Sequence, residues 1–201
     1  MPNPNRIVET CRKAVQPLVF LRQFVESPRA VGSFVPSGEH LAAAMVKGLA
    51  PCSGLVVELG PGTGVFTRRL LAMGIEPAHL MLVEFNPVFA RRLRKEFLGV
   101  DVAEGDAADL DMMLAERGLD KAALILSSLP FRNLPAESAS RIVMAMGRAL
   151  APGGTVVQFT YRLLPPIAPD DALRAGLAGR RQELVLANFP PAFVWHYDKR
   201  E

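Results

Sequence analysis

Short, mainly apolar runs recur along the chain and alternate with stretches in which apolar residues recur at helical spacing. The apolar runs, which predict β-strands, lie at residues 55–59, 80–84, 100–103, 122–126, 155–161, 183–187 and 193–197. Helices are expected at residues 41–49, 67–71, 86–97 and 137–149, with a loop and a short helix at 162–182. This alternation predicts an α/β fold that ends in a hairpin of the last two strands.

The first stretch of helical spacing covers residues 6–26. Its apolar residues are Ile7, Cys11, Ala14, Val15, Leu18, Leu21 and Val25. Pro17 cannot donate a hydrogen bond to the preceding turn, so we expect two short helices rather than one. Val19, Phe20 and Phe24 widen the apolar surface beyond one core-facing stripe, which is typical of a helix that lies on a membrane.

Positive charge is concentrated in the same part of the chain. Residues 1–29 contain five basic residues against two acidic ones, which equals the whole net charge of +3. This placement indicates that the N-terminus meets an anionic surface. The candidate membrane-binding residues are Arg6, Arg12, Lys13, Val19, Phe20, Arg22 and Phe24. We therefore expect residues 1–29 to form an amphipathic, membrane-associating segment and residues 30–201 to form the main domain. An ordinary helix that caps the core is the alternative.

The composition fits one domain with a sizeable core, since half of the 201 residues are hydrophobic. No apolar run is long enough to span a bilayer, and the first residues lack the apolar segment of a signal peptide, so we expect a cytoplasmic protein. Cys11 and Cys52 lie far apart and have no metal-ligand partners at typical spacing. We expect neither a disulfide nor a bound metal.

Glycines at every second position follow the first predicted strand. The stretch reads Glu58-Leu59-Gly60-Pro61-Gly62-Thr63-Gly64, and its glycines allow left-handed backbone angles and the close approach of a ligand. We expect the Glu58 carboxylate to order this loop. The spacing is not the dinucleotide-binding G-x-G-x-x-G, and no G-K-[ST] follows, so neither a dinucleotide nor a triphosphate is favoured. The second apolar run ends in Glu84, followed by Phe85, and an acid there can accept both ribose hydroxyls of a nucleoside.

An acid followed by this glycine spacing after a strand resembles motif I of class I S-adenosylmethionine-dependent methyltransferases. The resemblance implies a Rossmann-like, seven-stranded, mostly parallel sheet with an antiparallel last strand. It also implies S-adenosylmethionine as cofactor and S-adenosylhomocysteine as product. After the third strand, Asp106 would accept from the adenine amine while Ala107 contacts the ring. The glycine- and proline-bearing loop 31–40 is similar to one that folds over the cofactor in rRNA adenine dimethylases. The remaining candidate cofactor contacts are Ser33, Phe34, Gly105 and Ser127.

The fourth strand runs into Ser128-Leu129-Pro130-Phe131. This stretch resembles the N-P-P-Y/F motif of amine-directed methyltransferases, with serine in place of asparagine. Asparagine matches a planar adenine amine, whereas a serine hydroxyl suits an alkylamine. On this resemblance, Ser128 and the Leu129 carbonyl orient the amine, and Phe131 and Tyr161 face the methylated ammonium. A loop whose proline only ends the strand is the alternative.

Four stretches together look like the soluble, membrane-associating bacterial phospholipid N-methyltransferases. They are the basic N-terminal helix, residues 31–46, the glycine loop and residues 127–135. The resemblance implies stepwise methylation of phosphatidylethanolamine to phosphatidylcholine by an enzyme peripherally associated with the inner membrane. Three other functions stay open: adenine N6-methylation of RNA or DNA, methylation of a small-molecule amine, and non-catalytic cofactor binding at a membrane. Serine in place of asparagine argues against a nucleic acid partner, and the oligomeric state is left open.

Overall fold

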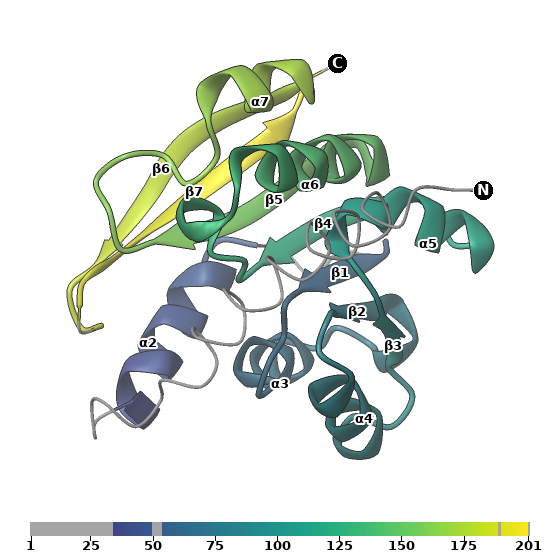
Figure 1. Cartoon of the computed structure of the whole chain (residues 1–201). Coiled ribbons are helices and arrows are strands. Elements are labelled where there is room, and N and C mark those ends of the chain that lie inside the picture. Colours follow the sequence, from purple (N-terminus) through teal and green to yellow (C-terminus); the bar gives the residue numbers. More distant parts are fainter. Residues whose placement is uncertain (1–33, 50–53, 189, 201) are drawn as a thin grey trace, which may run out of the picture.

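The computed structural model describes residues 34–49, 54–188 and 190–200. These residues form one seven-stranded sheet with helices on both faces (Figure 1). The strands are β1 (Val56–Leu59), β2 (Leu80–Glu84), β3 (Asp101–Glu104), β4 (Ala122–Ser127), β5 (Leu150–Thr160), β6 (Leu177–Val185) and β7 (Ala192–Lys199). The helices are α2 (Phe34–Val46), α3 (Val65–Ala72), α4 (Pro87–Glu96), α5 (Leu110–Glu116), α6 (Ala136–Ala149) and α7 (Pro169–Arg174). Short 3₁₀ helices lie at Pro77–His79, Ala107–Asp109 and Phe131–Asn133.

The strands are ordered β3-β2-β1-β4-β5-β7-β6 across the sheet. All pairings from β3 to β5 are parallel, and Val56 of β1 lies opposite both Leu80 of β2 and Leu124 of β4. β7 pairs antiparallel with both β5 and β6. The predicted mostly parallel seven-stranded sheet with an antiparallel last strand is confirmed. The strand order switches direction between β1 and β4, and open α/β sheets bind ligands beyond the carboxyl ends of strands at such a point.

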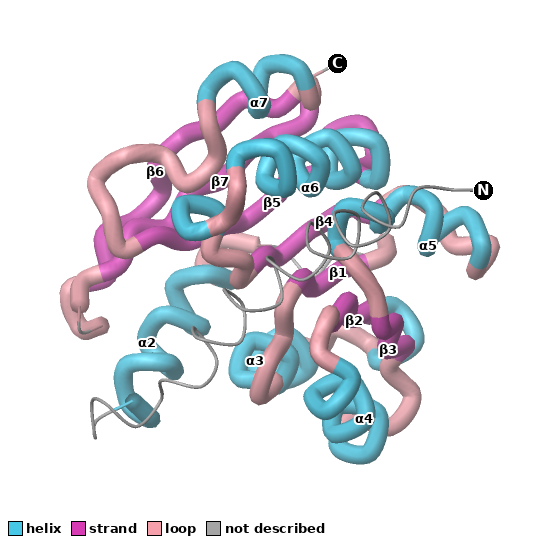
Figure 2. Tube along the Cα trace, viewed as in Figure 1, coloured by secondary structure: helices cyan, strands magenta, loops and turns pink. Residues whose placement is uncertain are grey.

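The sheet separates two layers of helices (Figure 2). Val57 and Ile125 belong to the core on the face covered by α5, α6 and α7. Val56 and Leu126 belong to the core on the face covered by α2, α3 and α4. Because both faces of the central parallel strands are buried, these strands read as continuous apolar runs rather than as alternating ones. This is why the apolar runs predicted β1, β2 and β4 closely.

Helix α2 begins earlier than the pattern predicted. It starts at Phe34 rather than at residue 41 and ends at Val46 rather than at residue 49, so residues 34–40 are helical and not part of a loop. Pro36 lies in the first turn, where its missing N–H has no intrahelical acceptor to lose. A Cβ on Gly38 would lie 3.7 Å from Val65 Cγ1, so this glycine lies close to α3. A proline and a glycine that predicted a loop are thus compatible with helix.

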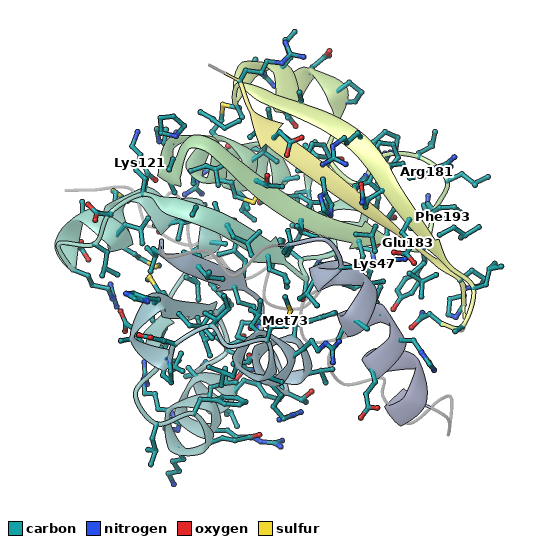
Figure 3. The ribbon with its side chains drawn as sticks, turned by 180° about the vertical axis from the view of Figure 1, so that it is seen from behind. Lys47, Met73, Lys121, Arg181, Glu183 and Phe193 are labelled. Atoms are coloured by element: carbon teal, nitrogen blue, oxygen red, sulfur yellow. The ribbon has the colours of Figure 1, made fainter. Side chains whose placement is uncertain are left out.

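Only the end of strand β6 was predicted, since the predicted strand covered residues 183–187 and β6 extends from Leu177 to Val185. Residues 180–182 are exposed polar residues on this edge strand, and they interrupt the apolar pattern. Lys47, directly after α2, donates to Glu183 Oε1 at 3.0 Å and so connects α2 to this edge of the sheet (Figure 3).

Two other elements differ from the expectation. Helix α5 was not predicted. Strand β5 already begins at Leu150, where a turn was expected, and its register against β4 shifts between Ala122 and Leu124. The proline and glycines of residues 152–154 are therefore accommodated within an irregular strand. The helix expected at 137–149 is confirmed as α6.

The predicted membrane-associating segment, residues 1–29, and the candidate cofactor residue Ser33 lie outside the described residues. In the part of the chain that the structure describes, none of the helices has the length and apolar character required to cross a bilayer.

Candidate active site

The glycine loop connects β1 to α3 at the predicted ligand-binding edge of the sheet. Gly60 and Gly64 have φ angles of 71° and 78°, in the left-handed region. A Cβ on Gly60 would lie 2.9 Å from Leu129 Cδ2, and one on Gly64 would lie 2.6 Å from Phe97 Cε2. Both positions therefore require glycine for their backbone angle and for their close contacts. The loop also contains Pro61 and Thr63, of which Pro61 is buried and Thr63 exposed.

Glu84, at the end of β2, holds the glycine loop. Its Oε2 accepts from the Gly62 N–H at 3.0 Å, and its Oε1 accepts from the Asn86 N–H at 2.8 Å. Burial raises the pKa of this carboxyl, and the backbone N–H groups of Asn86, Gly62 and Phe85 lower it. Because each carboxylate oxygen has a second lone pair, Glu84 keeps acceptor capacity for a ligand, as the ribose assignment requires.

Glu58 was expected to order the glycine loop, but its hydrogen bond goes to helix α3. Its Oε2 accepts from Thr67 Oγ1 at 2.7 Å. Its Oε1 is buried and has no hydrogen-bond partner among the described residues. Burial raises the pKa of Glu58 to about 8, with a smaller opposing effect of the Thr67 hydrogen bond. The carboxyl that hydrogen-bonds to the loop is therefore that of Glu84, whereas the buried Glu58 Oε1 is left without a hydrogen-bond partner among the described residues.

The turn after β3 lies next to the same edge. The Gly105 N–H donates to the Glu84 carbonyl at 3.1 Å. Asp106 Oδ1 accepts from the Ala108 N–H at 2.9 Å and caps the 3₁₀ helix that begins at Ala107. The structure thus brings Gly105, Asp106 and Ala107 to the end of β2, where the predicted adenine contacts should lie.

The four candidate catalytic residues, Ser128, Leu129, Phe131 and Tyr161, line one pocket beyond the ends of β4 and β5. The other lining residues are Pro130, Arg132, Asn133, Phe159, Thr160, Arg162 and Pro166. Phe131 is buried, whereas Tyr161 is 38% exposed. The Tyr161 phenol has a pKa raised by partial burial and lowered by a hydrogen bond with Asn188. Phe131 therefore forms the inner wall of the pocket, and Tyr161 lies at its open side.

Hydrogen bonds fix the turn that carries Ser128 and Leu129. The Ser128 N–H donates to the Leu59 carbonyl at 2.9 Å, and Ser127 Oγ accepts from the Leu129 N–H at 3.3 Å. The Leu129 carbonyl accepts from Gln158 Nε2 at 3.0 Å and from the Phe131 N–H at 2.9 Å. Both lone pairs of this carbonyl are thus used within the chain.

The Ser128 hydroxyl and Gln158 Oε1 are buried and have no hydrogen-bond partner among the described residues. They are the free polar groups beside the turn, and Ser128 is the one that lines the pocket. This leaves Ser128, rather than the Leu129 carbonyl, as the group available to an amine.

The sequence analysis did not identify Gln158, nor the pocket residues Phe159, Arg132 and Arg162. Gln158 lies opposite Ser127 in the β4–β5 pairing, which no local pattern reveals. Phe159 could have been found, because it lies two residues before Tyr161 on the same face of the strand. Their rings are 5.5 Å apart in an edge-to-face arrangement. In the described ranges, no cluster of three or more His, Cys, Asp or Glu residues could hold a metal ion.

Comparison with known proteins identifies the family. Residues 56–154, which include the glycine loop, Glu84 and the Ser128 turn, match a model described as a methyltransferase domain. An ornithine lipid N-methyltransferase from Singulisphaera acidiphila is 35% identical over 147 residues, which cover 71% of this chain and 76% of that protein. The chain belongs to the class I S-adenosylmethionine-dependent methyltransferases. The methyltransferase therefore uses S-adenosylmethionine and releases S-adenosylhomocysteine.

Other relatives match the methyltransferase over less of their length or only in fold. The ribosomal RNA small subunit methyltransferase A of Chlorobium chlorochromatii is 36% identical over 78 residues, which cover 38% of this chain and 27% of that protein. A methyltransferase from Burkholderia thailandensis, solved with S-adenosylhomocysteine, covers 100% of this chain and 92% of its own, with a TM-score of 0.64 and 13% identity. An N-methyltransferase from Bradyrhizobium japonicum, also solved with S-adenosylhomocysteine, gives a TM-score of 0.56 at 16% identity and covers 81% of this chain and 85% of its own.

The residues at the edge of the sheet fit the cofactor. A Cβ on Gly62 would have no atom within 4 Å, so the loop leaves open space there, and the buried Glu58 Oε1 has no hydrogen-bond partner among the described residues. The described residues that we predict to hold the cofactor are Glu58, Gly60, Pro61, Gly62, Thr63, Gly64, Glu84, Phe85, Gly105, Asp106, Ala107 and Ser127, and this assignment stays a prediction. Phe34, the first residue of α2, stays a predicted contact.

Proposed function

We propose that the methyltransferase modifies the primary amine of a membrane lipid, converting phosphatidylethanolamine through its mono- and dimethyl forms to phosphatidylcholine. The observation that carries this proposal is the pocket beyond β4 and β5. It combines the buried Ser128 hydroxyl with the rings of Phe131, Phe159 and Tyr161. A single hydroxyl suits an alkylamine, and the relative named as an ornithine lipid N-methyltransferase supports a lipid amine as the acceptor class.

The pocket must present the amine in its neutral form, because only a free lone pair can attack a methyl group. S-adenosylmethionine supplies that methyl group on a positively charged sulfonium. An alkylammonium with a pKa of ~10 lies about three units above pH 7, so deprotonation costs roughly 4 kcal/mol. Arg132 and Arg162 line the pocket, and no carboxylate or histidine of the described residues does, so local charge disfavours the ammonium form. Water then takes the proton.

Aromatic rings account for repeated methylation in the same pocket. Each added methyl group enlarges the head group and removes an N–H donor, so hydrogen bonding to Ser128 contributes less. The faces of Phe131 and Tyr161 attract a methylated ammonium through the ring quadrupole, by about 0.5–2 kcal/mol per ring. The pocket therefore suits the mono- and dimethyl amines as well as the primary amine.

We propose that the enzyme works while peripherally associated with the cytoplasmic face of the inner membrane. Residues 1–29 carry the net positive charge of the chain. Leu163 and Leu164, which are 72% and 62% exposed, directly follow the pocket residues Tyr161 and Arg162. The basic composition of residues 1–29, together with the exposed leucines next to the pocket residues, favours contact with an anionic bilayer.

The acceptor is tested by incubating the enzyme and labelled S-adenosylmethionine separately with liposomes of phosphatidylethanolamine, liposomes containing ornithine lipid, naked RNA and free ethanolamine. We expect label in mono-, di- and trimethylated phosphatidylethanolamine. Label in ornithine lipid alone would support a lipid as the acceptor but would contradict phosphatidylethanolamine as its head group. Adenine N6-methylation is the second candidate, because a ribosomal RNA methyltransferase is 36% identical to this chain over 78 residues. Label in RNA alone would refute a lipid substrate.

Membrane association is tested by sedimentation with phosphatidylglycerol-containing and pure phosphatidylcholine liposomes at low and high salt. Each basic residue near an anionic surface contributes about 1 kcal/mol, which salt screens. We expect the full chain to sediment with the anionic liposomes at low salt and a chain without residues 1–26 to lose this binding. Equal sedimentation with both liposomes, independent of salt, would contradict the electrostatic part.

A further inference from the structure

The amine pocket carries positive charge, although an amine substrate is itself a cation when protonated. Among the lining residues that the structure describes are two arginines, Arg132 and Arg162, and no aspartate or glutamate. A simple alkylammonium would be repelled by these two cations and would find no carboxylate to offset them. A substrate that carries its own anion near the amine would instead be attracted.

We propose that Arg132 and Arg162 form an anion-binding subsite at the mouth of the pocket and select a zwitterionic amine. This inference rests on the proposed function, and it names the feature of the head group that the enzyme requires. The shared chemistry is a primary amine a few bonds from an oxyanion, which is either the phosphodiester of phosphatidylethanolamine or the carboxylate of an ornithine lipid.

Arg162 is free to bind such an anion. Its side chain is exposed and makes no hydrogen bond or ion pair with any described residue. Its backbone N–H donates to Thr160 Oγ1 at 3.2 Å, which fixes the direction in which the chain leaves β5. A guanidinium offers five N–H donors in a planar fork that matches the two oxygens of a phosphate or a carboxylate.

Arg132 comes from a separate segment, the 3₁₀ helix Phe131–Asn133. Its Nη2 donates to the Pro165 carbonyl, so its guanidinium is held against the segment that begins with Arg162. That bond uses one of its five donors and leaves others for a ligand. The two arginines thus come from separate segments that meet at one pocket.

The exposed leucines next to Arg162 fit the same arrangement. Leu163 and Leu164 follow it directly and are 72% and 62% exposed. In phosphatidylethanolamine the phosphodiester lies between the amine and the acyl chains. In the protein sequence Arg162 likewise lies between the pocket residue Tyr161 and the exposed Leu163 and Leu164.

The test uses soluble short-chain substrates, which remove any contribution from membrane charge. Dibutyroyl-phosphatidylethanolamine is compared with an analogue in which a neutral ether chain replaces the phosphodiester. A short-chain ornithine lipid is compared with its methyl ester in the same way. For wild type, Arg162→Gln, Arg162→Lys, Arg132→Gln and the control Arg91→Gln, the ratio of kcat/KM within each pair is measured. Arg91 is an exposed arginine on α4, outside the pocket.

In the wild type we expect removal of the oxyanion to lower kcat/KM by about ten- to a hundredfold in at least one pair. This ratio should fall toward one in Arg162→Gln, recover partly in Arg162→Lys and stay at the wild-type value in Arg91→Gln. Arg132→Gln should reduce the ratio as well. The pair with the larger ratio identifies the phosphodiester or the carboxylate as the anion. Unchanged affinity for S-adenosylhomocysteine in all variants would show that the cofactor half is intact.

Three outcomes overturn the subsite. The wild type could methylate both members of each pair equally well, or the ratio of kcat/KM could stay at the wild-type value in Arg162→Gln and Arg132→Gln. In either case the arginines do not bind the substrate anion, and the proposed lipid amine activity stands. If the wild type methylates none of the lipids, the proposed function fails and the subsite fails with it.

Discussion

The buried carboxyl of Glu58 should make the stability of the cofactor-free enzyme depend on pH, and replacing Glu58 with glutamine should remove this dependence. Glu58 is fully buried, and burial raises its pKa from 4.5 to about 8 despite the hydrogen bond from Thr67. Between these pH values the folded chain keeps a proton that the unfolded chain has lost. The contribution of Glu58 to stability is therefore fully present below pH 4.5 and is lost as the pH rises through 8.

The magnitude follows from the two pKa values. A difference of about 3.5 units at about 1.36 kcal/mol each gives about 5 kcal/mol, and the two units from pH 5 to pH 7 account for about 2.7 kcal/mol. In a chain of this size about 1 kcal/mol shifts the melting temperature by about 2–4 °C. The melting temperature of the wild type should thus fall relative to that of Glu58→Gln by roughly 5–10 °C between pH 5 and pH 7.

The measurement is thermal and urea unfolding of both proteins without cofactor at pH 5, 6, 7 and 8. His196, whose pKa is lowered by burial and by Arg180, gives a pH dependence of opposite sign, and comparison with the variant cancels it. Thr67→Val is the matched control, because it removes the hydrogen bond that lowers the pKa of Glu58 and should keep the slope. Parallel curves for the wild type and Glu58→Gln would refute the burial argument.

Three further substitutions test the site. Gly60→Val should abolish binding of S-adenosylhomocysteine, because this residue has a φ of 71° and a Cβ there would lie 2.9 Å from Leu129 Cδ2; calorimetry that gives wild-type affinity would contradict this. Glu84→Ala should weaken the same binding at least about tenfold, because the Gly62 N–H loses an acceptor contributing about 1.5 kcal/mol or more, and an equilibrium titration that finds no change would make Glu84 only a strand-end acid. Phe131→Leu should lower turnover more than cofactor affinity, because the ring lines the amine pocket; equal losses in both would indicate a packing role.

The fold was predictable where the local pattern and the burial agree. Residues 55–59 and 122–126 form central strands buried on both faces, so their apolar runs match β1 and β4 closely. The start of β6 was not predictable, because exposed polar residues at 180–182 lie on an edge strand. The start of α2 was missed because Pro36 and Gly38, which favour a loop, fit a first helical turn and a close contact with α3.

The positions of the site residues could be predicted from the sequence, but their hydrogen-bond partners could not. The glycine spacing placed the loop, and the acids at strand ends placed Glu58 and Glu84. Which of the two acids binds the loop depends on the direction of each side chain: Glu58 accepts from Thr67 of α3, whereas Glu84 accepts from the Gly62 N–H. Gln158 was missed because its partner, the Leu129 carbonyl, belongs to a segment far away in the sequence. Arg162 was missed because only the folded chain brings it into one pocket with Ser128 and Arg132.

Leu129 links the cofactor loop to the amine pocket. Its side chain lies where a Cβ on Gly60 would clash, so it packs against the loop, and the residue also lines the pocket. Its N–H donates to Ser127 Oγ at 3.3 Å, and its carbonyl accepts from Gln158 Nε2 at 3.0 Å. A residue held at both backbone polar groups cannot shift without breaking hydrogen bonds. Methyl transfer requires the amine and the methyl group in line and near contact, and a misplacement of about 1 Å can cost roughly a hundredfold in rate. The fixed position of Leu129 therefore sets the separation between the two halves of the site, which the four-residue motif alone does not specify.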